Sequence, residues 1–85
     1  MAASTVAVRV LLFGVYRELA GRPELQIELP SGSSLAELVT ELRALPGLER
    51  LPERPAVARN LKYASLSEIL DPADEVALIP PVAGG

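Results

Sequence analysis

The residues best suited to chemistry are the last two of the chain, Gly84 and Gly85, which end it in a bare carboxylate. Neither residue has a Cβ atom, so the backbone of another protein can approach this end closely. A terminus this thin can enter a tunnel that a bulkier one would block. The chemistry to expect is therefore the presentation of a terminal carboxylate to a partner's site. The simpler interpretation is a frayed terminus, as at the ends of most domains.

The four residues before this pair favour the first interpretation. Pro80 and Pro81 fix φ and have no N–H to donate to a sheet, so a strand that reaches Ile79 has to stop there. Ile79 precedes a proline and is therefore driven towards an extended conformation. The four residues after Pro81, beginning with Val82 and Ala83, add roughly 13 Å of extended chain at about 3.3 Å per residue.

The rest of the chain offers no obvious catalytic group. It contains neither cysteine nor histidine, which excludes thiolate chemistry, disulfides and the commonest general base and metal ligand. Three carboxylates cluster around the turn that precedes the last strand: Asp71, Asp74 and Glu75. We expect them to be solvated charges and turn formers rather than catalytic or metal-binding groups. We expect no metal site and no bound cofactor, and a chain that serves as a carried substrate while its partners supply the catalytic groups.

Composition limits the class of protein. The 85 residues suffice for one small domain, and 49% hydrophobic with only 4% aromatic residues predicts an aliphatic core. The net charge of −3 argues against a nucleic-acid binder, which would carry a basic patch. No apolar run approaches the ~20 residues that span a bilayer, and residues 1–5 lack the features of a signal peptide. A soluble cytoplasmic protein without membrane association is expected.

Two strands are predicted after a loose N-terminus, residues 1–5. In the first strand, 6–13, four apolar residues alternate onto one face: Val6, Val8, Val10 and Leu12. The other face carries Arg9 together with Leu11 and Phe13, and these last two would be exposed unless a partner covers them. Residues 24–29 alternate in the same way, with leucine and isoleucine inward, and should pair antiparallel with the first strand.

The clearest local prediction is a helix that begins at Ser34. Ser34 and Glu37 have the spacing of a capping box, in which each side chain satisfies a free backbone donor. The apolar positions that follow form one stripe at helical spacing: Leu35, Leu38, Val39, Leu42 and Leu45. Pro46 and Gly47 should end this helix. A single helical turn is also expected at 17–20, with Gly21 as its stop.

The second half of the chain predicts shorter elements. Residues 48–55 contain two prolines and four charged residues and are expected to form a surface loop. Residues 56–59 and 61–63 are predicted as a small hairpin that turns at Asn60. Three apolar residues should lie at the margin of the core: Leu66, Ile69 and Leu70. The last strand, 75–79, follows a turn.

This order of elements predicts an α+β domain of the β-grasp type over residues 6–79, with residues 80–85 as an extended tail. Its mixed sheet would carry one main helix across one face. The first and last strands would lie side by side and parallel, joined by the long crossover that a parallel pair requires.

Two segments carry a resemblance to a known family. Residues 13–21 have the sequence Phe-Gly-Val-Tyr-Arg-Glu-Leu-Ala-Gly, and residues 74–85 have the sequence Asp-Glu-Val-Ala-Leu-Ile-Pro-Pro-Val-Ala-Gly-Gly. They resemble the aromatic-x-x-x-Arg-Glu-Leu-x-Gly segment and the Pro-Pro-Val-x-Gly-Gly ending of ubiquitin-like sulfur carriers, specifically of the small subunits of molybdopterin synthase. The resemblance extends from about residue 8 to the end of the chain and implies the ubiquitin-like β-grasp fold.

The resemblance implies a route for sulfur. An adenylating, E1-like activating enzyme uses ATP to adenylate the carboxylate of Gly85, and sulfur delivered with a sulfurtransferase replaces the adenylate to give a thiocarboxylate. The tail then enters the large catalytic subunit, where its sulfur passes to cyclic pyranopterin monophosphate in molybdenum cofactor biosynthesis. Activation is needed because a terminal carboxyl group, with a pKa of about 3.3–3.7, is ionised at neutral pH and resists nucleophilic attack.

Candidate partner-binding residues lie on the tail and beside it. Leu11, Phe13 and Ile79 are expected to form an apolar contact face, and the alternative for Phe13 is a place in the core at a strand end. Arg17 is a candidate to pair with an acidic group of a partner, and a solvated arginine is the alternative. The tail residues that would contact the receiving subunit are Pro80, Pro81, Val82 and Ala83.

Two other functions are compatible with a terminal diglycine. One is a sulfur carrier for thiamine synthesis or another pathway, although thiamine carriers are usually shorter and lack the Pro-Pro pair. The other is a ubiquitin-like protein modifier, which would form an isopeptide bond between Gly85 and a lysine of another protein.

Overall fold

The computed structural model describes residues 4–81. The predictions for residues 1–3 and for Val82, Ala83, Gly84 and Gly85 concern residues outside this range. The elements in chain order are β1 (Thr5–Leu12), α1 (Gly14–Ala20), β2 (Glu24–Pro30), α2 (Leu35–Arg43), β3 (Ala56–Arg59), β4 (Lys62–Ala64) and β5 (Glu75–Ile79). Neither helix in this range is long and apolar enough to cross a membrane.

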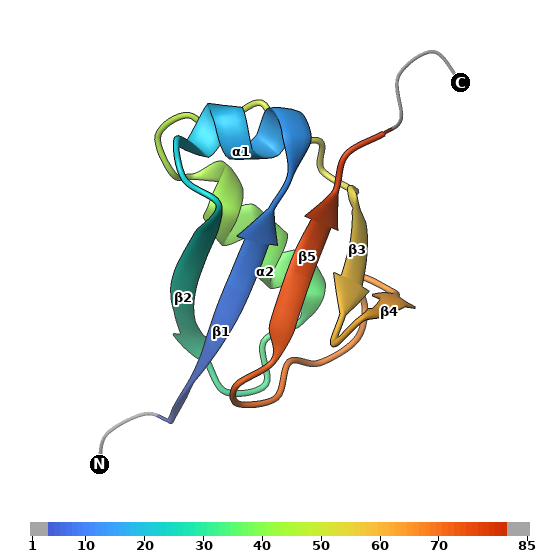
Figure 1. Ribbon diagram of the computed structural model, residues 1–85. Helices are drawn as coiled ribbons and strands as arrows, with labels where there is room; N and C mark the ends of the chain where they lie inside the picture. Colours follow the sequence, from blue (N-terminus) through green and yellow to red (C-terminus); the bar gives the residue numbers. More distant parts are fainter. Residues whose placement is uncertain (1–3, 82–85) are drawn as a thin grey trace.

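The strands form one mixed sheet in the order β2-β1-β5-β3-β4. β1 and β5 are parallel, and the other neighbouring pairs are antiparallel. Helix α2 crosses one face of this sheet, and α1 lies across the end where β1 finishes (Figure 1). This arrangement confirms the predicted β-grasp architecture, including the parallel pairing of the first and last strands.

The alternation predicted for the first two strands is confirmed. All four inward residues of β1 are buried, and Leu29 of β2 is buried beside them. β1 begins earlier than predicted, because Thr5 belongs to it and the Ser31 N–H donates to the Ser4 carbonyl at 3.0 Å. The prediction of a loose segment through residue 5 is therefore wrong for Thr5, whose register partner is Pro30.

Helix α2 begins with the predicted capping box. The Ser34 N–H donates to Glu37 Oε1 at 2.9 Å, and the Glu37 N–H donates to Ser34 Oγ at 3.2 Å. The first four residues of the predicted apolar stripe are buried, and all of them except Val39 belong to the core cluster shared with the sheet. Leu45 is only half-buried, because the helix ends at Arg43 and Leu45 lies beyond it.

Helix α1 is longer than the predicted single turn and begins at Gly14. Its N-terminus has no side-chain cap, so the helix depends on tertiary packing, which is supplied by buried Tyr16. Gly21 ends it as predicted, in the left-handed conformation with its N–H bonded to the Arg17 carbonyl at 2.9 Å. The domain therefore has a second short helix besides the main one.

Two predictions in the second half of the chain are wrong. Residues 48–55 form a loop, as expected, but Leu48 and Leu51 are 1% and 2% exposed and belong to the core. The loop is held inward because Arg43 Nε donates to the Leu51 carbonyl at 2.9 Å. Ile69, predicted at the margin of the core, is 52% exposed, whereas its neighbour Leu70 is buried.

Candidate functional site

The tail leaves the sheet from its middle strand. β5 lies between β1 and β3, with Leu78 opposite Leu12 on one side and Ile79 opposite Ala56 on the other. The strand ends at Ile79, as the two prolines require, and the chain then leaves the sheet at its upper end in Figure 1. Ile79, Pro80 and Pro81 form the root of the tail, and the domain packs against the first two, which are half-buried, while Pro81 is exposed.

Gly14, the first residue of α1, lies beside this root. Its φ is +52°, a left-handed conformation that residues other than glycine adopt only at an energetic cost. A Cβ atom at this position would lie 3.4 Å from Cγ of Pro80, so the α1 backbone is already close to the tail. The start of the short helix therefore lies next to the first residue of the tail.

A groove of about 420 Å³ adjoins the root of the tail. Its lining contains a single charged side chain, that of Arg54, and is otherwise made of Tyr16, Pro52, Pro55, Ala56, Tyr63, Ile79, Pro80 and Pro81. Burial raises the pKa of Tyr16, so its hydroxyl remains protonated at neutral pH. This groove cannot be predicted from the sequence, because its residues come from four separate segments that only the fold brings together.

The outer face of the sheet, opposite α2, is apolar near the tail. Leu11 of β1 is aligned with Ala77 of β5, which is aligned with Ala58 of β3. Ile79 lies two residues beyond Ala77 and therefore shares this face. The structure thus brings Leu11 and Ile79 together at the end of the sheet from which the tail departs.

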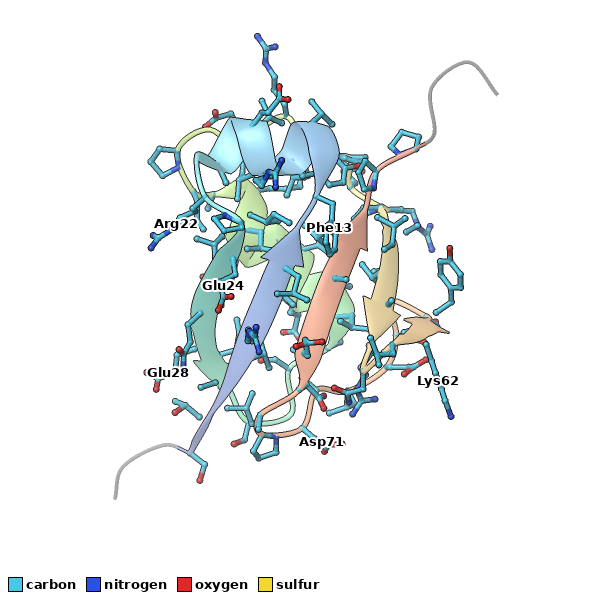
Figure 2. The ribbon with its side chains drawn as sticks, in the orientation of Figure 1. Phe13, Arg22, Glu24, Glu28, Lys62 and Asp71 are labelled. Carbon is cyan, nitrogen blue, oxygen red and sulfur yellow. The ribbon has the colours of Figure 1, made fainter. Side chains whose placement is uncertain are left out.

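Phe13 follows β1 directly and extends this apolar face. Its side chain is 46% exposed, which excludes the alternative of a core residue at a strand end. Figure 2 shows it beside the ends of β1 and β5. We call Leu11, Phe13, Ala77 and Ile79 the outer apolar face. Arg17 is exposed on α1 and belongs neither to this face nor to the groove lining.

The opposite end of β5 is held by a network of charged residues. Arg59 donates to three carboxylates: Nε to Asp74 at 2.8 Å, Nη1 to Glu68 at 3.2 Å and Nη2 to Asp71 at 2.6 Å. Asp74 is 5% exposed and also accepts from Asn60 Nδ2 at 2.9 Å and the Asp71 N–H at 2.7 Å. The prediction that Asp74 is a solvated charge is therefore wrong, although the turn at this position is confirmed.

The pKa shifts in this network follow from its hydrogen bonds. Burial pushes the pKa of Asp74 upward, but the bonds from the Asp71 N–H, Asn60 and Arg59 outweigh it and hold this pKa below its usual value. The Ser65 N–H and then Arg59 lower the pKa of Glu68. The bond to Asp74 raises the pKa of Arg59 further, against an opposing effect of burial. All three groups are fully charged at neutral pH.

The described residues hold the fold together and surround the root of the tail. No group of three or more histidine, cysteine, aspartate or glutamate side chains suited to a metal ion lies within residues 4–81. The charged network lies at the far end of β5 from the tail, where it stabilises the fold. At the end that carries the tail, the domain presents the outer apolar face, the groove beside Pro80 and the root of the tail. Such features suit the binding of another protein.

Comparison with known proteins agrees with this geometry. Residues 10–85 match the ThiS family. The molybdopterin synthase sulfur carrier subunit of Arabidopsis thaliana is 41% identical over 83 residues, which cover 96% of this chain and 86% of that protein.

Two solved structures show the same fold. SAMP1 from Haloferax volcanii superposes with a TM-score of 0.81 at 30% identity, covering 93% of this chain and 99% of that one. A chain from a complex of subunits 1 and 2 of molybdopterin-converting factor from Helicobacter pylori superposes with a TM-score of 0.68 at 28% identity, covering 94% of this chain and 100% of that one. With a family match over most of its length and a relative this similar, the chain belongs to the ThiS family.

Proposed function

We propose that this chain is the sulfur carrier subunit of a molybdopterin synthase. The observation that carries the proposal is the similarity to a sulfur carrier subunit over 96% of the chain. The family match, which includes the terminal diglycine, supports it. The half-buried root of the tail at Ile79 and Pro80 supports it as well, because a carrier has to present its terminus from a folded domain.

The sulfur is carried at Gly85. An activating enzyme uses ATP to convert its carboxylate to an acyl-adenylate with release of pyrophosphate, and a sulfur nucleophile delivered through a sulfurtransferase then displaces AMP. The product is a thiocarboxylate, whose sulfur is transferred to cyclic pyranopterin monophosphate. Gly84 gives clearance for the tail inside the partner's site, because it has no side chain. ATP binds to the activating enzyme and not to this chain.

The large synthase subunit is the partner that receives the tail. The outer apolar face and the groove beside Pro80 adjoin the root of the tail, so a subunit that takes up Val82 and Ala83 would also cover them. Apolar surface next to a functional terminus is typical of a protein interface. The Helicobacter pylori complex of subunits 1 and 2 supports a heteromer of this kind. Arg17, exposed on neighbouring α1, is a candidate for an ion pair at the margin of the interface.

Catalytic groups come from the partners in this proposal, and the cytoplasm is the proposed site of action. A carrier for thiamine synthesis and a protein modifier are less well supported. The full-length relative described above is named as a molybdopterin synthase subunit, and a Pro-Pro pair precedes the diglycine.

The test is reconstitution with the large subunit, the activating enzyme, ATP, a sulfur donor and cyclic pyranopterin monophosphate. The full chain should support molybdopterin formation, and a chain without Gly84 and Gly85 should reduce it to background. Arg22→Gln, at an exposed position in the turn before β2, is the matched control and should be fully active. Undiminished product with the truncated chain would refute the proposal.

A further inference from the structure

Strand β2 forms one edge of the sheet and leaves backbone groups unpaired. The Leu12 N–H donates to the Pro23 carbonyl at 2.8 Å, and the Ser31 N–H donates to the Ser4 carbonyl at 3.0 Å. Backbone groups alternate in direction along a strand, so odd-numbered residues between Pro23 and Ser31 face β1. Glu24, Gln26 and Glu28 therefore direct their N–H and C=O groups away from the sheet.

The end of this edge opens into an acidic groove between β2 and α2. The groove has a volume of about 450 Å³, and its lining is Glu28, Leu29, Pro30, Ser31, Gly32, Ser33, Glu37, Thr40 and Glu41. Three of these residues are glutamates and none is basic. Figure 2 shows Glu24 and Glu28 along β2, at the margin of the sheet. The open backbone edge and the negative charge thus occur at the same place.

The other edge of the sheet is less suited to pairing. β4 has only three residues and begins with Lys62, whereas β2 has seven. Short edge strands and edge lysines are devices that discourage strand pairing. β2 has neither device, and its only proline, Pro30, is its last residue. The edge that is open to another strand is therefore β2.

Charge determines which strand fits. Glu24 is already paired with Arg9 at 3.1 Å, whereas Glu28 and Glu41 line the groove. A second copy of this chain would bring Glu28 against acidic side chains like its own, and the chain carries a net charge of −3. Like charges placed opposite each other destabilise a strand pair. A segment with basic side chains would instead place positive charge beside Glu28 on the outer face of the sheet, or beside Glu41 on the face that α2 covers.

The acidic groove lies at the far end of the sheet from the tail, whereas the start of β2 lies closer to it, because Glu24 is aligned with Leu11 of the outer apolar face. The last residue of β2, Pro30, pairs with Thr5 at the start of β1, whereas Ile79 lies beyond the other end of β1. A segment added along β2 would lie in the plane of the sheet, and β2 and β1 would separate it from β5 and Pro80. The domain can be held at one edge while its tail is used elsewhere.

We propose that the edge of β2 and its acidic groove bind an extended, basic segment of a partner protein by strand addition. The backbone of Glu24, Gln26 and Glu28 supplies the hydrogen bonds, as in other cases of strand addition to an open edge. The glutamates select for positive side chains. This inference does not depend on which group the tail carries.

The test uses an eight-residue synthetic peptide of alternating lysine and valine, capped at both ends, titrated into the full-length protein. NMR chemical-shift changes are expected along β2 and the start of α2, with binding measured by calorimetry. Gln26→Pro removes an outward N–H without removing a ladder bond, so it should abolish binding while Gln26→Ala retains it. Glu41→Lys should weaken binding about three- to tenfold, whereas Glu18→Lys, an exposed glutamate on α1, should not.

A second experiment uses the unmodified protein, so its result does not depend on how the variants fold. The same peptide N-methylated at alternate residues keeps its charge but loses the backbone donors needed for pairing, and it should not bind. Equal binding of the methylated peptide, shift changes confined to β4 or the outer apolar face, or no binding of the unmodified peptide would each overturn the proposal.

Discussion

The two ends of β5 differ in what surrounds them. At its start, Asp74 and Glu75 are fixed by side chains from β3 and β1: Arg59 and Asn60 bond to Asp74, and Arg9 pairs with Glu75 at 3.2 Å. At its finish, Ile79 and Pro80 adjoin a groove lined in part by Tyr16 of α1 and an apolar face of the sheet that α2 does not cover (Figure 1). At the start of β5 the polar side chains bond to one another within the domain, whereas at its finish apolar side chains are left accessible to a partner.

This difference indicates how a small domain can present a terminus. The tail begins on a central strand, so any movement of β5 would move the tail as well. The charged network anchors the strand at the end where no partner is required. The opposite end is then free to keep exposed apolar side chains such as Phe13, which stability alone would not favour.

The largest expected effect comes from Asp74→Ala at the anchored end. This buried carboxylate accepts from Arg59, Asn60 and the Asp71 N–H, so its loss leaves three donors without their acceptor. The free energy of unfolding should fall by about 2–3 kcal/mol, measured by urea denaturation. The control is Asp71→Ala, whose side chain is 72% exposed and which should lose about 1 kcal/mol or less. Equal losses in the two variants would contradict an anchoring role for Asp74.

Phe13→Ala tests the end of β5 near the tail. In contrast to Asp74→Ala, it should weaken binding to a partner and leave stability nearly unchanged. The exposed side chain contributes little to folding, so the free energy of unfolding should change by about 0.5 kcal/mol or less. Affinity for the large synthase subunit should fall about tenfold, because an aromatic side chain at an interface loses its packing. Leu61→Ala, at a residue that is 91% exposed beyond β3, is the control and should bind normally. Unchanged affinity of the Phe13 variant would remove this residue from the interface.

Gly14→Leu tests the contact between α1 and the tail. A side chain at φ +52° should cost about 1–2 kcal/mol of stability, and its atoms beyond Cβ should also press on Pro80. Gly21→Leu has a similar backbone strain, at φ +77°, but meets no atom within 4 Å of its Cβ. Both variants should lose similar stability by thermal unfolding, and only the Gly14 variant should transfer sulfur more slowly. Equal transfer rates would show that Gly14 does not position the tail.

The smallest effect is the pH dependence of stability. The folded pKa values of Asp74 and Glu68 lie below their usual values, so these groups bind protons more weakly in the folded state than in the unfolded one. Their contribution to stability is therefore complete above the unfolded pKa values of about 3.9–4.3 and is lost as the pH falls through the folded ones. Urea denaturation between neutral and acidic pH should show this loss, and it should be smaller in Asp74→Asn. An identical pH profile for the two proteins would contradict the assignment.

The sequence predicted what depends on local pattern. Alternation identified the faces of β1, and the Ser34–Glu37 spacing identified the start of α2, because both follow from repeat and capping geometry. The Pro80–Pro81 pair identified the end of β5 for the same kind of reason. The apolar face formed by Leu11 and Ile79 followed from alternation together with the expected parallel pairing.

What the sequence did not predict depends on contacts between distant segments. Leu48 and Leu51 lie among charged residues and prolines without a regular repeat, so their burial appears only once the loop folds against α2. Arg59 and Asp74 are 15 positions apart, and no spacing rule joins them before the sheet is assembled. The groove beside Pro80 needs segments that include Tyr16 and Tyr63, and therefore requires the complete fold.

The central claim is that the terminal carboxylate of Gly85 is activated and receives sulfur. The most direct measurement is intact-protein mass spectrometry after incubation with the activating enzyme, ATP and a sulfur donor, followed by fragmentation to locate the change. The account predicts a mass gain equal to the difference between one sulfur and one oxygen atom, confined to Gly85 and absent when ATP is omitted. An unchanged mass with a competent activating enzyme, or sulfur found at any other residue, would contradict it.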